Sequence, residues 1–151
     1  MNHCVVSQIF FSETYRVPPE QTARHLFARL PHGKGYADHM VDAMATGYLV
    51  SVFESICARE LQPHLDWDEE TAVGTTVQCR HRAPIPANAL IKIDGWVIGI
   101  GDQEVTFWVR ASDEHETVFE GRIRFAIVRR AQIDQRIQRK CRLTEHLEAF
   151  A

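Results

Sequence analysis

The 151-residue sequence lacks the short motifs that mark several large enzyme classes. It contains no GxxxxGKS or GxxxxGKT phosphate loop, no GxSxG nucleophile elbow, no HExxH zinc motif and no EF-hand loop. Gly99 and Gly101 form a lone GxG pattern between two strand-like runs, and no helical pattern follows it, so we interpret it as a turn. These absences argue against phosphoryl transfer, against serine hydrolysis of the elbow type and against a bound metal.

Cysteine is sparse, and its spacing shows no pairing pattern. The four cysteines are Cys4, Cys57, Cys79 and Cys141, and no CxxC pair occurs. This spacing fits neither a zinc ribbon nor a thioredoxin-like motif. The first eleven residues have no basic region and no long apolar run, so neither a signal peptide nor a membrane span is predicted. We therefore expect free thiols and a reducing, cytoplasmic environment.

The sequence also has no excess of basic residues. Seventeen Lys and Arg against twenty Asp and Glu give a formal net charge of -3, so neither nucleic acid nor an acidic membrane is expected as a partner. A hydrophobic content of 45% and a charged content of 25% are average for a globular protein. Together with the chain length, this composition predicts a single domain over residues 1–151.

One long helix is predicted over residues 42–61. The stretch contains no proline, and apolar residues such as Leu49 and Phe53 recur at helical spacing. Asp42 is expected to cap the first turn, and Pro63 is expected to end the helix. The amphipathic spacing requires that one broad face be buried against a flat apolar surface.

Five runs rich in alternating or β-branched residues are predicted to form strands: 8–17, 71–82, 90–98, 104–111 and 117–129. A loop-rich segment, 19–39, separates the first strand from the helix and is interpreted as a lid. The order of strand, lid, helix and four antiparallel strands predicts an α+β fold, in which a curved antiparallel sheet wraps around one central helix. The core is expected over about residues 8–130, and 131–151 are expected to be a polar tail, weakly helical only near 144–150.

Three polar residues stand in apolar surroundings. Glu54 is either a solvated side chain or, if a second subunit covers it, a partly desolvated carboxylate that can act as a base or a nucleophile. Thr46 either bonds a carbonyl one turn back or takes part in a site. His81 is either structural or catalytic, and alternation places it on the inward face of its strand together with Val73 and Thr75.

Several short motifs occur in a definite order. They are Ala45-Thr46-Gly47-Tyr48, Glu54 eight residues after the threonine, Val73-Gly74-Thr75, and Arg80-His81 seven residues after the glycine. In order and spacing they resemble the fluoroacetyl-CoA thioesterase family, and the similarity extends over roughly residues 10–140. That family has the hotdog fold, so the resemblance implies a hotdog fold here, which agrees with the predicted order of elements.

The resemblance implies a catalytic set of threonine, glutamate and histidine at Thr46, Glu54 and His81, with neither a metal nor a bound organic cofactor. Glu54 would attack the thioester carbonyl or activate water. Thr46 would position the substrate or stabilise the oxyanion, and His81 would move protons. Gly74 matches a glycine that lies near the thioester in the family.

The sequence departs from the family where selectivity for fluorine resides. Selective members carry aromatic gate residues ahead of the threonine and an arginine on the last strand. Here Met40 stands at the gate position and Phe125 at the arginine position, with Arg124 one residue away and, by alternation, on the other face. We expect these three residues to contribute to substrate binding, without a strong preference for fluoroacetyl-CoA.

The function implied is hydrolysis of a short or small acyl-CoA thioester to the free acid and CoA. Two alternatives stay open: an acyl-CoA-binding or sensing domain without catalysis, and an enoyl-CoA hydratase of the same fold. Eight of the seventeen basic residues lie between Arg122 and Arg142. They form either a solvated surface or a docking surface for the phosphates of CoA.

A homodimer is expected on physical grounds. The helix has a second apolar flank of Val50, Cys57 and Leu61, roughly opposite its main stripe. One sheet is not expected to cover both sides of the helix, and a five-stranded unit exposes sheet edges. Association with a second copy would cover both.

Overall fold

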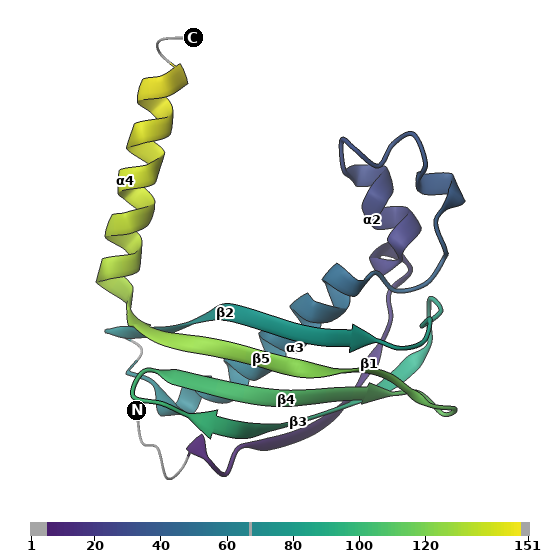
Figure 1. The fold of residues 1–151 in the computed structure, drawn as a ribbon, viewed down its shortest axis with the longest axis horizontal. Helices are drawn as coiled ribbons and strands as arrows, with labels where there is room; N and C mark the ends of the chain where they lie inside the picture. Colours follow the sequence, from purple (N-terminus) through teal and green to yellow (C-terminus); the bar gives the residue numbers. More distant parts are fainter. Residues whose placement is uncertain (1–5, 67, 149–151) are drawn as a thin grey trace.

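The computed structural model describes residues 6–66 and 68–148, the last six of them as backbone only. Five antiparallel strands form one sheet, which curves around the helix α3 (Thr46–Leu61) (Figure 1). The strands are β1 (Phe10–Arg16), β2 (Glu70–His81), β3 (Leu90–Ile100), β4 (Glu104–Ser112) and β5 (Thr117–Arg129). The predicted α+β architecture of a curved sheet around one central helix is confirmed.

The order of the strands in the sheet differs from their order in the chain. β3, β4 and β5 are neighbours, whereas β1 pairs with β3 and β2 pairs with β5, which gives the order β1-β3-β4-β5-β2. β2 is therefore an edge strand of twelve residues, and its middle residues, 74–78, are exposed. Such an edge presents a row of backbone N–H and C=O groups that another strand can pair with.

The core lies between α3 and the concave face of the sheet. Leu49 and Phe53 are fully buried, and the Phe53 ring stacks on Phe119 of β5 with 4.6 Å between ring centroids. Cys57 and Leu61 are also fully buried within the single chain. The expectation that one sheet leaves the flank of Cys57 and Leu61 uncovered is therefore wrong, because the sheet curves around the helix.

Helix α3 begins four residues later than predicted, at Thr46. Residues 43–45 are extended instead, because their backbone bonds to segments that lie beside them in the fold. Met44 and Ala45 each donate their N–H group to a loop carbonyl at 2.8 Å. Ala45 occupies the cap position, so the expected cap at Asp42 is wrong.

A β-bulge follows Gly74 in strand β2. The extra residue is Thr75, whose hydroxyl donates to the Arg124 carbonyl at 3.2 Å. Because a bulge shifts the alternation of side chains, Gly74 faces α3 together with His81. The predicted placement of Val73 and Thr75 on the same face as His81 is wrong for this reason.

Residues 19–40 form a lid beside the start of α3. The lid contains α2 (Ala23–Arg29) and two short 3-10 turns, η1 (Pro19–Gln21) and η2 (Ala37–His39). The Ala23 N–H donates to the Ala43 carbonyl at 2.8 Å and so ties the lid to the extended segment before α3. After α2 the chain folds back against the helix. The approach is so close that a Cβ atom at Gly33 would lie 2.0 Å from the Phe27 carbonyl oxygen.

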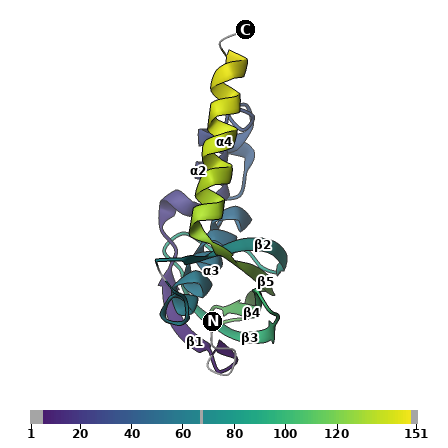
Figure 2. The same cartoon turned by 90° about the vertical axis from the view of Figure 1, so that its left-hand side faces the viewer.

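The C-terminal segment forms a 19-residue helix, α4 (Arg130–Glu148), which follows β5 directly and projects away from the sheet (Figures 1 and 2). At its base the Arg130 N–H donates to the Glu69 carbonyl at 2.8 Å. The expectation of a tail that is helical only near 144–150 is wrong, because arginine, glutamine and lysine are good helix formers despite their polarity. Residues 149–151 lie outside the described part of the chain. No helix within residues 6–66 and 68–148 is long and apolar enough to span a membrane.

Candidate active site

Thr46 and His81 meet at one end of the sheet. Thr46 is the first residue of α3, and His81 is the last residue of β2. The Thr46 Oγ1 atom lies 2.9 Å from His81 Nδ1, and the tautomer of the ring decides which atom donates. The fold thus brings together two of the three residues expected to form a catalytic set. We call them the threonine–histidine pair.

The surroundings of His81 favour a neutral imidazole. The ring is half-buried and stands edge-on to the Phe119 ring, with 6.5 Å between centroids. Its other nitrogen, Nε2, is buried and has no hydrogen-bond partner among the described residues. Burial lowers the pKa of His81 below its ordinary value of 6.5, and the backbone of Ala83 acts to a lesser extent in the opposite direction. In the single chain His81 is therefore neutral at pH 7 and able to accept a proton.

The first turn of α3 presents backbone N–H groups next to this pair. The Leu49 N–H makes the first bond of the helix, to the Ala45 carbonyl at 3.1 Å. The N–H groups of Thr46, Gly47 and Tyr48 therefore have no partner inside the helix, and no side chain at the cap position accepts them. A helix N-terminus carries partial positive charge and favours an anion beside it. The later helix start thus makes the surroundings of Thr46 suited to an oxyanion.

An apolar pocket of about 550 Å³ lies beside the threonine–histidine pair. Thr46, Gly47 and His81 form part of its wall. Most of its apolar lining comes from the lid and from the extended segment before α3: Ala23, Leu26, Phe27, Met40, Val41, Ala43 and Met44. A pocket of this size and character accommodates a small acyl group. Met40, the residue at the expected gate position, therefore lies in the same pocket as the pair.

Glu54 lies further along α3, against strand β2. A Cβ atom at Gly74 would lie 2.2 Å from the Glu54 Oε1 atom, so the carboxylate occupies the space that the glycine leaves free. The side chain is half-buried and forms no hydrogen bond or ion pair with a described residue. Gly74 pairs across the sheet with Phe125, which is 1% exposed. The structure thus brings together Glu54, Gly74 and Phe125.

This Glu54 contact and the threonine–histidine pair are separate within one chain. Eight residues of α3 separate Thr46 from Glu54, which corresponds to about 12 Å along the helix axis. Seven residues of β2 separate Gly74 from His81, which corresponds to about 23 Å along the strand. A glutamate side chain does not span this separation. The expected set of three residues is therefore divided into two half-sites in a single chain.

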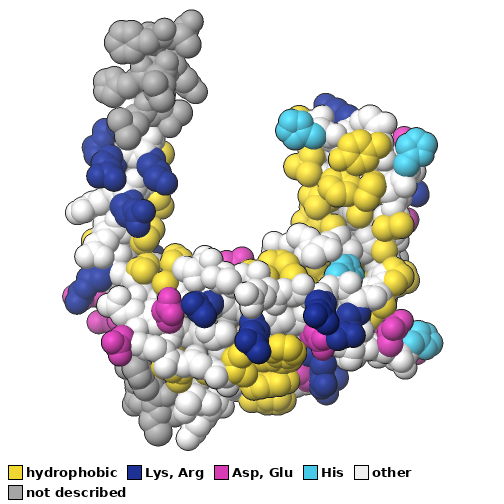
Figure 3. Space-filling model, viewed as in Figure 1, with side chains coloured by type: hydrophobic (Ala, Val, Ile, Leu, Met, Phe, Trp, Pro, Cys, Tyr) yellow, Lys and Arg dark blue, Asp and Glu magenta, His cyan; other side chains and the backbone are white. Residues whose placement is uncertain are grey.

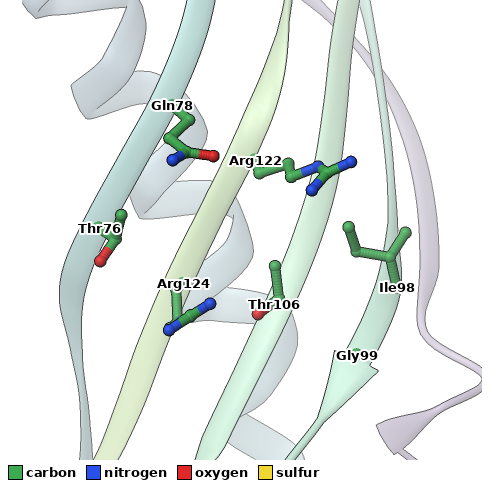
Figure 4. Close-up of a pocket in the computed structure, with 7 residues that line it drawn as sticks. All are labelled: Thr76, Gln78, Ile98, Gly99, Thr106, Arg122 and Arg124. Carbon is green, nitrogen blue, oxygen red and sulfur yellow. The ribbon is translucent and has the colours of Figure 1, made fainter.

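Arg124 lies on the outer face of the sheet. Figure 4 shows it with Arg122 beside a pocket on this face, and α3 lies behind the strands in that view. The Arg124 guanidinium is 3.8 Å from the Glu104 carboxylate. Alternation along β5 directs Phe125 inward and Arg124 outward, so the structure does not bring Arg124 to the inner site.

No metal centre is evident in the part of the chain that the structure describes. Within residues 6–66 and 68–148, no group of three or more His, Cys, Asp or Glu side chains is arranged to hold a metal ion. Three cysteines are free thiols as predicted, namely Cys57, Cys79 and Cys141. Cys4 lies outside the described residues.

The sequence alone did not indicate that the lid lines the pocket. Ala23, Leu26 and Phe27 are spaced i, i+3 and i+4 on α2 and share one face, which lines the pocket. This spacing was visible in the sequence, although seven residues are too few for a convincing helical period. Met44 lines the pocket because its segment is extended, which no local pattern indicated.

The chain is similar to known proteins of one enzyme family. The family model described as "FlK: Fluoroacetyl-CoA-specific thioesterase" matches residues 31–131, more than half of the chain. The fluoroacetyl-CoA thioesterase of Streptantibioticus cattleyicolor is 23% identical over 130 residues, which cover 86% of this chain and 90% of the relative.

Solved structures share the fold. A structure of the fluoroacetyl-CoA thioesterase FlK matches with a TM-score of 0.78 at 23% identity, over 87% of this chain and 94% of FlK. A hot-dog-like protein from Thermanaerovibrio acidaminovorans matches with a TM-score of 0.76 at 15% identity, over 93% and 97% of the two chains. A thioesterase superfamily member from Thermus thermophilus matches with a TM-score of 0.73 at 21% identity, over 93% and 94%. These matches confirm the hotdog fold, and the family match over most of the domain shows that the chain belongs to the fluoroacetyl-CoA-specific thioesterase (FlK) family.

Proposed function

We propose that this protein hydrolyses the thioester of a short acyl-CoA. The observation that carries the proposal is the 2.9 Å contact between Thr46 and His81 at the uncapped first turn of α3, beside an apolar pocket. A proton-transfer group, oxyanion donors and an acyl-binding surface thus lie within one site. A variant of the family member FlK has been solved with fluoroacetate and CoA, which supports the substrate class.

The acyl group occupies the apolar pocket, and the carbonyl oxygen points to the first turn of α3. Negative charge develops on this oxygen as the tetrahedral intermediate forms. The N–H groups of Thr46 and Gly47, the Thr46 hydroxyl and the positive end of the helix stabilise this charge. Removal of one such donor typically costs about 10²- to 10³-fold in turnover.

A homodimer supplies the carboxylate that the pair lacks. Two copies that pair their β2 edges in antiparallel fashion, centred on the middle of the strand, place Gly74 of the partner subunit opposite Val77. Val77 is four residues from His81, or about 13 Å along the strand, whereas the chain's own Gly74 is about 23 Å away. We therefore place Glu54 of the partner subunit nearer to the threonine–histidine pair than the chain's own Glu54.

Hydrolysis then divides among three side chains. Glu54 either attacks the carbonyl carbon itself or removes a proton from the water that attacks. The carbon–sulfur bond breaks when the tetrahedral intermediate collapses, and CoA leaves as a thiolate. In the water route the proton that Glu54 removed passes through the His81 imidazole to this thiolate. In the direct-attack route His81 takes a proton from the water that hydrolyses the anhydride and passes it to the thiolate. In the direct-attack route, water then hydrolyses the anhydride formed on Glu54.

Release of free CoA thiol from a panel of acyl-CoA esters tests the function. We expect hydrolysis of short esters, with Glu54→Gln keeping CoA affinity and losing about 10²- to 10⁴-fold in turnover. Loss of enoyl absorbance without thiol release would show a hydratase instead. Binding without turnover would show a sensor.

The same panel tests the acyl selectivity. Because Met40 and Phe125 replace the gate aromatic and the arginine, we expect fluoroacetyl-CoA to be preferred over acetyl-CoA by no more than about 200-fold.

Replacement of Gly74 tests the position of the Glu54 carboxylate. In Gly74→Ala the new Cβ displaces Oε1, which it would otherwise approach to 2.2 Å, while the backbone is unstrained. We expect an unchanged fold and KM, with turnover lower by about a hundredfold, since small misplacements of reacting groups have effects of this size. Gly101→Ala is the matched control, because its Cβ meets only the Glu104 Cβ at an ordinary 3.7 Å. Full activity of Gly74→Ala would contradict a catalytic Glu54.

The titration of His81 tests its proximity to a carboxylate. Burial alone lowers the pKa of His81 below 6.5. In the dimer, Glu54 of the partner subunit favours the imidazolium and raises this pKa. We expect NMR titration to give a lower His81 pKa in Glu54→Gln than in the parent, and parent turnover to fall as the pH drops through the parent value, because the protonated ring accepts no proton. Equal pKa values in the two proteins would show that no carboxylate approaches His81.

A further inference from the structure

Two segments extend past the same edge of the sheet. β2 forms this edge, and Figure 1 shows α4 rising beyond one of its ends and the lid rising beyond the other. Figure 2 shows α4 and α2 in line when the molecule is viewed from its side, so the two segments lie at a similar depth relative to the sheet. The chain therefore has the shape of a U, with β2 at its base.

α4 lies far from the pocket of its own chain. It follows Arg129, which pairs with Glu70, the first residue of β2. The threonine–histidine pair lies at the last residue of β2, His81. The twelve residues of β2 span about 40 Å, so α4 and the threonine–histidine pair, which lie at opposite ends of the strand, are far apart.

Antiparallel pairing of two β2 strands exchanges these ends. A two-fold axis normal to the sheet places the Glu70 end of one strand against the His81 end of the other. In a single chain, α4 and the lid lie at a similar depth relative to the sheet (Figure 2). Rotation about this axis leaves that depth unchanged, so α4 of one protomer would run beside the lid of the other. With 19 residues, α4 is about 28 Å long, enough to pass along the whole lid.

The lid and α4 both carry exposed apolar side chains. The lid and the residue that follows it expose Leu30, Tyr36 and Val41, at 42%, 46% and 64%. On α4, Ile133 and Ile137 share one face at i, i+4 spacing, and Ile137 is 54% exposed. Figure 3 shows hydrophobic side chains along the side of α4 that faces the gap and also over the lid. Contact between copies would remove both surfaces from water.

The other side of α4 is basic. Arg136, Arg139 and Arg142 recur every three residues and line a shallow hollow with Gln132 and Gln135. None of the three guanidinium groups forms an ion pair with a described residue. A row of arginines without an acidic partner among the described side chains is suited to phosphate groups, which arginine binds in bidentate fashion.

We propose that α4 of each protomer completes the substrate site of its partner: α4 packs beside the partner's lid, and its three arginines bind the phosphates of CoA outside the partner's pocket. This inference rests on the proposed thioesterase function and on the β2 dimer. CoA carries its phosphates at the end of a long arm remote from the thioester, so the phosphates lie outside a pocket that holds the acyl group. The match to the family model ends at residue 131, so all but the first two residues of this helix lie beyond it.

Calorimetric titration with CoA tests the phosphate site. We expect the triple variant Arg136→Gln, Arg139→Gln, Arg142→Gln to bind CoA about tenfold or more weakly than the parent, since charge-assisted hydrogen bonds are lost. Pantetheine, which lacks the nucleotide phosphates, should bind both proteins equally. The matched control, with lysine at the same three positions, should keep most of the affinity because it keeps the charge. Unchanged CoA affinity in the glutamine variant would overturn the inference.

Mixed dimers test whether α4 acts on the partner. His81→Ala protomers, which have an intact α4, are combined with glutamine-variant protomers, which have an intact pocket. If α4 acts across the dimer, the mixture hydrolyses dilute acyl-CoA faster than the sum of the two separate proteins. If α4 serves its own chain or no site, the rates only add, and the inference fails. A parent that binds CoA through α4 but hydrolyses no acyl-CoA would instead contradict the proposed function alone.

Discussion

The rigidity of α3 is the constraint on which the site depends. A helix holds residues eight apart at about 12 Å, so Thr46 and Glu54 keep this separation whatever surrounds them. His81 joins Thr46 through one hydrogen bond, while Gly74 makes room for the Glu54 carboxylate. One chain therefore holds the three residues as two separate groups, and in the proposed site a second copy of the chain would bring all three together.

Strand β2 contributes to both groups of residues and forms the edge through which the proposed dimer would join them. β2 ends at His81, carries Gly74 near its middle and forms an unpaired edge of the sheet. The bulge after Gly74 turns this glycine toward α3 and so sets the position of Glu54. Pairing of two such edges would satisfy their backbone groups and bring complementary half-sites closer. Assembly and catalysis would then depend on one element.

The sequence predicted which helices and strands form better than it predicted where they begin and end. The strand predicted at 117–129 matches β5, because alternation over that length is unambiguous. The start of α3 was misplaced, since the bonds that hold Met44 and Ala45 extended come from loops remote in sequence. The bulge was missed because alternation assumes a regular strand, and α4 was missed because it has only a narrow apolar face. For the site, the contact of Thr46 with His81 agrees with the expected set, but periodicity alone gives no distance between Glu54 and that pair.

The most direct test of the account is complementation between two inactive variants. Glu54→Gln protomers keep the threonine–histidine pair, and His81→Ala protomers keep the carboxylate. If Glu54 acts across the dimer, each mixed dimer contains one complete site, and random mixing of equal amounts restores about a quarter of the parent turnover. If Glu54 acts within its own chain, each mixed dimer contains two defective sites. A mixture no more active than its components would contradict the account.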